Sequence, residues 1–193
     1  MNYLEKVKKN GCALEYVPTE LHTAELCLAA VKQDCWALEH VPLELRTVKL
    51  CLAAVKKNSW VLKHVPLEHR TAELCFAAVK QDGCALEHVP LERRTAELCF
   101  AAVKQNGWEL RYVPRGIFQP NEIYKGNYLF STILGSRDSQ TMYDIESNQV
   151  YCGCFKDTLE SFEIAVKDTH KNTNYLQGYL EFINICKTNK KSK

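Results

Sequence analysis

Apolar and polar positions follow a period of 24 residues over the first 114 residues. The phrase TAELCLAAVKQ begins at Thr23 and returns, little changed, at Thr47, Thr71 and Thr95 without an insertion. A fixed period of this length is typical of repeat proteins, in which stacked units bury a shared core. The pattern predicts a mainly α chain, with about four and a half 24-residue helix-helix repeats that form an α-solenoid over residues 1–114.

Each repeat is predicted to hold a long helix and a shorter helical segment. The threonine that opens the phrase is an N-cap, and the lysine near its end suits the negative end of the helix dipole. The shorter segment stops at a Val-Pro pair, because the residue before proline avoids the α region. It is predicted to span one to two turns, partly as 3-10 helix. Gly83 and Gly107 are predicted to end the long helices in the left-handed conformation.

The repeat phrase LCxAAVKQ(D/N)GxALEHVP resembles a bacterial and viral repeat family known as domain of unknown function 4116. The alternation of long and short helices is also similar to that of leucine-rich-variant solenoids. The resemblance covers residues 1–114 and implies an α-helical repeat fold. It implies no activity.

After residue 114 the 24-residue phrase is lost and loop-forming residues become frequent. Three runs have strand character: residues 128–134, 141–145 and 149–155. Short turn candidates between them favour an antiparallel meander, and two amphipathic helical stretches follow. Residues 115–193 are therefore predicted to form a small α+β module, a three-stranded antiparallel meander plus two helices, that caps the open end of the repeats.

The segment LGSRDSQTMYDIESNQVYCGCFKDTLESFEIAVKDTH resembles a C-terminal module of uncharacterised bacterial and phage repeat proteins. The similarity lies in a GSR turn, a CGCF strand and a TLExF helix. It implies a recurring companion domain for repeat arrays and assigns no catalytic residues.

Composition limits the classes of partner. The chain carries a net charge of +2, so its overall charge gives no sign of a nucleic-acid binder. Lysines 187, 190, 191 and 193 are predicted to form a frayed, solubilising basic tail. No stretch approaches the ~20 apolar residues of a membrane span, and no leader pattern opens the chain. A cytoplasmic protein without a membrane partner is expected, and its ten cysteines are expected to be free thiols.

Aromatic and histidine side chains recur at two positions of the repeat, and we call this set the ring column. It contains Trp36, His40, Trp60, His64, His88, Trp108 and Tyr112. Residues four apart share a helix face, and Trp and Tyr are frequent in binding hot spots. The column could hold an extended peptide or a partner helix. Alternatively, the tryptophans pack at the edge of the core and the histidines cover them, an interpretation the pattern slightly favours.

Thiol chemistry and phosphate binding are two further hypotheses. Cys152 and Cys154 could be reactive thiols, with His170 as a base, but their strand spacing also suits one buried face. The columns of Lys32 and Arg46 equivalents could follow a phosphate backbone, but a glutamate column nearly cancels their charge. Cys27 and its equivalents Cys51, Cys75 and Cys99 are expected in the core, since stacked repeats hold them too far apart to share a metal.

We therefore expect a non-enzymatic scaffold that binds a protein or peptide partner. The first alternative is a thiol-active or small catalytic C-terminal module delivered by the repeats, and the second is a nucleic-acid-binding solenoid. No cofactor, metal ligand or catalytic residue is predicted, because the chain has no phosphate loop, paired metal motif or nucleophile elbow.

Overall fold

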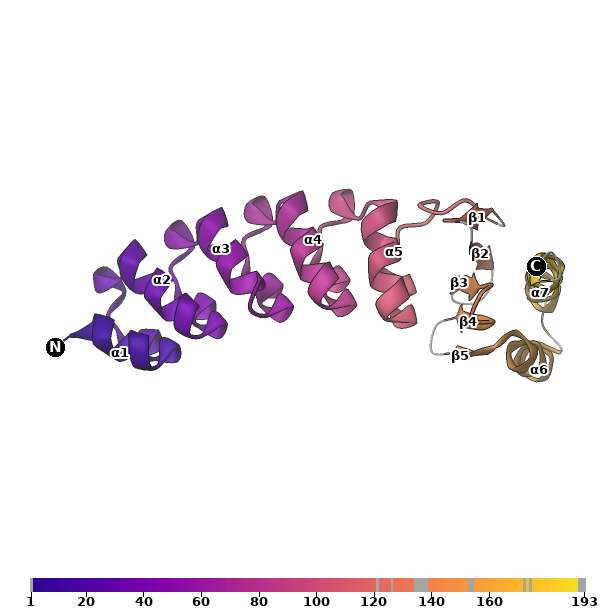
Figure 1. Cartoon of the computed structure of the whole chain (residues 1–193), viewed down its shortest axis with the longest axis horizontal. Helices are drawn as coiled ribbons and strands as arrows, with labels where there is room; N and C mark the ends of the chain where they lie inside the picture. The colour runs from indigo at the N-terminus through magenta and orange to yellow at the C-terminus, as the bar shows by residue number, and fades with distance from the viewer. Residues whose placement is uncertain are drawn as a thin grey trace. The chain divides into compact units, whose positions relative to one another are not determined.

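A computed structural model describes residues 2–120, 122–125, 127–133, 139–152, 155–171, 173 and 175–190. The chain divides into two compact units, Met1–Arg94 and Thr95–Lys193. Figure 1 labels the helices and strands of both. The prediction of a mainly α chain with a C-terminal α+β part is confirmed. The division predicted at residue 114 follows the sequence repeat and stays a prediction, since the second unit also includes the fifth repeat.

The first unit is a stack of repeats, each built from one α-helix and two 3-10 helices. The α-helices are α1 (Tyr3–Lys9), α2 (Ala24–Gln33), α3 (Val48–Val55) and α4 (Ala72–Gln81), and each contacts the next. The longer 3-10 helices are η1 (Gly11–Tyr16), η3 (Cys35–His40), η5 (Ser59–His64) and η7 (Gly83–His88). The shorter are η2 (Thr19–Leu21), η4 (Leu43–Leu45), η6 (Leu67–His69) and η8 (Leu91–Arg93). The short helices after proline were not predicted.

Threonine caps the long helices as expected. The Thr71 hydroxyl accepts a hydrogen bond from the Leu74 amide at 3.3 Å, and Thr23 accepts one from the Leu26 amide at 3.2 Å. These bonds satisfy amides that the first helical turn leaves without a partner.

The expectation of left-handed glycines at the helix ends is wrong. Neither Gly83 nor Gly107 has a positive φ, and α4 ends at Asp82 in extended backbone with φ −148°. The Asp82 carboxylate accepts from the Cys84 amide at 2.9 Å and so starts the next 3-10 helix immediately. A small residue is needed at this position for space, because a Cβ at Gly11 would lie 2.4 Å from the Ala30 carbonyl oxygen.

Arginines at one repeat position, which we call the arginine column, join neighbouring repeats. The Arg70 guanidinium donates to the Val65 and Lys63 carbonyls of its own repeat at 2.9 and 3.2 Å. It also donates to the His88 carbonyl of the next repeat at 2.6 Å. Arg46 makes the equivalent bonds to the carbonyls of Val41, Glu39 and His64. The arginine column thus satisfies carbonyls at the ends of two successive 3-10 helices.

Glutamines at another repeat position, Gln33 and Gln81, bond to the repeat that precedes them. The Gln33 amide accepts from the Gly11 backbone at 2.6 Å and donates to the Lys9 carbonyl at 3.3 Å. Gln81 bonds the preceding repeat in the same way. Lys57 replaces glutamine in the repeat between them, and its ammonium donates to the carbonyls of Lys32 and Gln33.

The second unit begins with α5 (Ala96–Gln105) and η9 (Gly107–Tyr112). The strands are β1 (Ile123–Tyr124), β2 (Tyr128–Ile133), β3 (Ser139–Asp144), β4 (Gln149–Cys152) and β5 (Phe155–Thr158). Among the described residues they form a five-stranded antiparallel sheet in chain order. The expectation of three strands is therefore corrected, because β1 was missed and the predicted strand over 149–155 is two strands, β4 and β5. Helices α6 (Leu159–His170) and α7 (Leu176–Lys190) follow.

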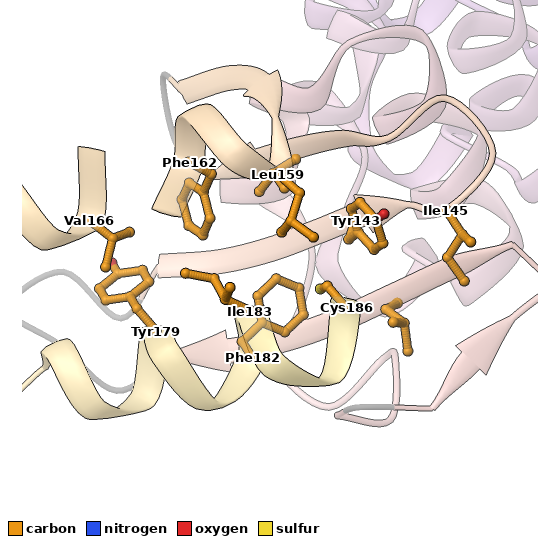
Figure 2. Packing of buried hydrophobic residues seen from close by; sticks show 11 residues of the cluster. Tyr143, Ile145, Leu159, Phe162, Val166, Tyr179, Phe182, Ile183 and Cys186 are labelled. Carbon is orange, nitrogen blue, oxygen red and sulfur yellow. The ribbon is translucent and has the colours of Figure 1, made fainter. Parts of the chain in front are cut away.

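The sheet is buried on both faces. Leu129, Tyr143 and Val150, aligned across β2, β3 and β4, pack with α6 and α7 in an apolar core (Figure 2). Phe130, Met142 and Tyr151 point to the other face, where Phe118 stacks on Phe130 with ring centroids 3.9 Å apart. On that same face a Cβ at Gly107 would lie 2.0 Å from Tyr151, so η9 packs directly on the sheet. The fifth repeat is thereby covered by the sheet.

The predicted basic tail is wrong for its described part. Lys187 and Lys190 lie within α7, where Lys187 pairs with Glu163 at 2.5 Å and Lys190 with Glu160 at 2.8 Å. The hydrogen bonds from Lys190 and Asn148 lower the pKa of Glu160 to about 2. These lysines tie α7 to α6, while Lys191 and Lys193 lie outside the described residues.

The arginine column predicts a stability effect. We expect Arg70→Lys to lower the free energy of unfolding by about 2–3 kcal/mol, because an ammonium cannot reach three carbonyls with the fixed fork of a guanidinium. Denaturant unfolding followed by circular dichroism would measure it. Arg93→Lys is the matched control, since Arg93 is exposed. Equal losses for the two variants would contradict the assigned role of the column.

Candidate functional site

Trp36, in the first unit, is half-buried against the repeat that follows it. Its ring lies edge-on to His64, with centroids 6.1 Å apart and planes at 81°. The Lys63 ammonium sits over the same ring, 5.2 Å from its centroid. A lysine above an indole is held by the ring quadrupole. Most of the Trp36 side-chain surface thus packs against side chains of the next repeat.

Trp60 leaves more of its ring in solvent. Its side chain is 46% exposed, while its indole N–H donates to the Asp82 carboxylate at 3.0 Å. Cys12, at the equivalent position, donates its thiol to Asp34 at 3.2 Å. The polar atom at this position therefore contacts the capping aspartate of the next repeat, and the ring face remains accessible.

The histidines of the ring column are half-buried. Burial lowers the pKa of His64 and His88 below the ordinary value, and for His64 the nearby Glu39 carboxylate, 3.9 Å from Nε2, opposes this shift. His40 is also half-buried. The His64 ring covers Trp36, the arrangement that the edge-packing interpretation describes.

Trp108 and Tyr112 continue the sequence pattern in the second unit. Trp108 is 48% exposed and lines a small hollow of about 50 Å³ together with Tyr151, Phe155 and Lys156. Tyr112 is half-buried, and the Arg111 guanidinium lies 4.7 Å from its ring centroid. Trp108 is thus the more accessible of the two rings.

Two apolar columns were missed by sequence reasoning. Leu43, Leu67 and Leu91, the leucine column, follow each Val-Pro pair and are 64, 65 and 64% exposed. Leu28, Leu52, Phe76 and Phe100, the helix-face column, lie in the middle of the α-helices. Phe76 is 42% exposed, and Leu28 lines an open hollow of about 460 Å³ between α1 and α2. Their fixed place in the repeat phrase was visible in the sequence, whereas their exposure depends on the neighbouring repeats.

The thiols of the repeats are buried as predicted. Cys27, Cys51, Cys75 and Cys99 have no exposed surface, and burial raises the pKa of Cys51 to about 11. Cys152 is half-buried at the edge of the core of the second unit, where its sulfur accepts from the Thr141 hydroxyl at 3.3 Å.

The other residues of the thiol hypothesis are Cys154 and His170. Cys154 lies outside the described residues. The His170 ring stacks on Tyr179 with centroids 4.9 Å apart. Across the described residues, no group of three or more His, Cys, Asp or Glu side chains is placed to hold a metal ion.

Charged columns differ in their availability. The guanidinium groups of Arg46 and Arg70 are engaged by backbone carbonyls, whereas Lys32, Lys56 and Lys80 are exposed. Of these two columns, only the lysines are therefore available to a phosphate backbone. None of the described helices has both the length and the apolar character to cross a membrane.

One buried acid also escaped sequence reasoning. Glu109 is 1% exposed in η9, and its carboxylate accepts from the Asn106 amide at 3.2 Å. Earlier repeats hold Ala13, Ala37 or Val61 at this position, so the break in an apolar column was the available signal.

The buried histidines predict a pH dependence. With a lowered pKa in the folded state, His64 and His88 take up protons first in the unfolded chain as the pH falls below about 6.5. Their contribution to stability is complete above that pH and is lost below it. We expect the melting temperature to fall less between pH 7.5 and 5.5 in a His64→Gln, His88→Gln variant than in the intact chain. Parallel melting curves would contradict this.

Comparison with known proteins identifies the repeats. The model of the family described as domain of unknown function (DUF4116) matches residues 3–46, 47–94 and 73–117. No curated protein and no solved structure matches the chain. The resemblance noted for the C-terminal module stays a prediction, since the family match ends at residue 117. With its matches spanning more than half of the chain, this protein belongs to the DUF4116 family.

Proposed function

We propose that this chain is a non-enzymatic scaffold whose repeats bind a protein or peptide partner. The observation that carries the proposal is the leucine column, in which Leu43, Leu67 and Leu91 are each about two-thirds exposed at the same position of successive repeats. A single exposed leucine is ordinary on a protein surface. Three at a fixed interval give a partner a regular row of apolar contacts, each worth about 1.5–3 kcal/mol if fully buried.

The use of the polar groups supports the same function. The described threonine, aspartate, glutamine and arginine positions bond to backbone atoms within or between repeats. Such groups are occupied in keeping the repeats stacked. Besides the exposed lysine and glutamate columns, the surface chemistry that repeats and stays accessible is apolar and aromatic, which favours recognition of another protein.

The ring column adds anchors of the type found in binding hot spots. Trp60 and Trp108 keep nearly half of their surface in solvent, at 46 and 48%. Trp36, His40, His64, His88 and Tyr112 are half-buried, and we assign them to the support of the exposed rings. Tryptophan combines a large contact area with few rotatable bonds, so its ordering on binding costs little entropy.

Affinity capture from the source cell tests the proposal. We expect the intact chain to retain one protein specifically, and a Trp60→Ala, Leu67→Ala variant to bind it about 30-fold more weakly, as the loss of a hot spot of ~2 kcal/mol implies. Glu68→Ala is the control, because Glu68 is an exposed neighbour of Leu67. Recovery of nucleic acid with an affinity that falls steeply with salt would instead support the nucleic-acid alternative.

Thiol titration tests the catalytic alternative. At neutral pH we expect no thiol of the folded chain to react faster than a simple free cysteine, because burial raises the pKa of the repeat thiols and leaves little thiolate. The measurement compares the intact chain with Cys152→Ala. A fast-reacting thiol present in the first and absent from the second would favour a thiol-active C-terminal module.

A further inference from the structure

Two helices of this chain have the same sequence and different surroundings. Helices α4 and α5 both read AELCFAAVKQ. Phe76 in α4 is 42% exposed, whereas Phe100 at the same place in α5 is 7% exposed. The two helices do not differ in sequence. The difference therefore comes from what covers each helix.

The turn between β1 and β2 covers Phe100. The Tyr128 ring meets Phe100 nearly perpendicularly, with centroids 4.7 Å apart, and Tyr124 lies 5.0 Å away at 59°. The Lys125 ammonium sits 5.0 Å from the Phe100 centroid and 5.7 Å from that of Tyr124. Edge-to-face aromatic pairs and a cation over a ring are both attractive beyond simple apolar burial.

An acidic residue of α5 acts electrostatically on the same turn. The pKa of Tyr124 is raised first by burial and then by the negative charge of the Glu97 carboxylate. Glu97 lies one turn before Phe100 on the same helix face. The covering turn thus packs on the Phe100 ring, close to the negative charge of Glu97.

Helix α4 presents the same groups without a cover. Glu73 and Phe76 are exposed, and Ala77 is half-buried. We call these three residues the α4 face. An aromatic ring this exposed has apolar surface to lose, and its neighbouring carboxylate can accept a hydrogen bond or attract an ammonium group.

We propose that the α4 face binds a partner protein through a turn that carries two aromatic side chains and a lysine between them, the chemistry of Tyr124, Lys125 and Tyr128. The inference rests on the proposed scaffold function and specifies its partner. It adds the helix-face column to the surfaces that contact the partner, beside the ring and leucine columns.

The residue that supports the covering turn differs between the two repeats, and this difference determines what a partner must supply. In the second unit, Phe118 supports the covering turn, with its ring 5.0 Å from Tyr124 and stacked on Phe130. The fourth repeat has Arg94 at the equivalent position, and its guanidinium donates to the Val89 and Glu87 carbonyls. A partner must therefore supply its own apolar support behind the turn.

A peptide taken from this chain tests the proposal. The probe is residues 122–130 closed into a turn by a disulfide between cysteines added at its two ends. The full-length chain carries isotope-labelled phenylalanine, so that the ring signals of Phe76 and Phe100 are followed separately by NMR. We expect a saturable shift of the Phe76 signals, no shift of the Phe100 signals, and at least about tenfold weaker binding to Phe76→Ala, as loss of an aromatic pair and its buried area implies.

Matched controls separate the chemistry from non-specific binding. A peptide with serine in place of both tyrosines and glutamate in place of the lysine should leave the Phe76 signals unmoved. The Trp60→Ala, Leu67→Ala variant keeps the α4 face and should bind the original peptide as the intact chain does. Phe76 is exposed, so its replacement should leave the far-ultraviolet circular dichroism unchanged.

Several outcomes would overturn the assignment. They are absence of a saturable Phe76 shift, a shift confined to Phe100, and equal binding of the two peptides. A shift of the Phe76 signals with protein concentration alone would identify a second copy of the chain as the occupant instead. If Phe76→Ala captures the cellular partner normally while Trp60→Ala, Leu67→Ala does not, the scaffold function stands and the α4 face is excluded; if nothing is captured, the scaffold function itself fails.

Discussion

The structure of the repeats depends on how backbone carbonyls at the ends of 3-10 helices find partners. Each such helix stops after six residues at a Val-Pro pair, and its last carbonyls cannot be satisfied within the segment. Arg70 supplies these bonds to its own repeat and to the next, so stacking and termination are achieved by one side chain. The strict 24-residue period follows, because an insertion would move the guanidinium away from the second set of carbonyls.

This dependence explains what the sequence could predict. Thr71 and its equivalents were predicted as caps because the rule concerns neighbours in the chain. The role of the arginine column was not foreseen, since its acceptors lie up to 18 residues away and belong to another repeat. The sequence pattern predicts a helix terminator at Gly107, whereas its real constraint is the approach of Tyr151, 44 residues later on the sheet that packs against η9. Strands β1 and β5 are too short for an alternating pattern to mark them.

The sequence predicted which residue types make up the candidate site, but it did not predict which of them are exposed to solvent. Sequence spacing placed Trp36 and Trp60 in one column, yet it could not tell that Lys63 and His64 cover the first while Asp82 holds only one edge of the second. Exposure is a property of neighbouring repeats. The exposure of the leucine column was not predicted for the same reason. Its members resemble core residues in the sequence pattern, but they are exposed to solvent in the structure.

The identical sequences of α4 and α5 carry a consequence for how such arrays acquire contacts. A terminal repeat must offer a surface that its cap can adhere to, and duplication of that repeat copies the adhesive surface into the interior of the array, where no cap reaches it. A new interaction surface then arises without any point mutation. An array that grows by duplication of its last unit therefore gains exposed surfaces that can already bind another chain. Natural selection then either retains such a surface or favours changes that cover it.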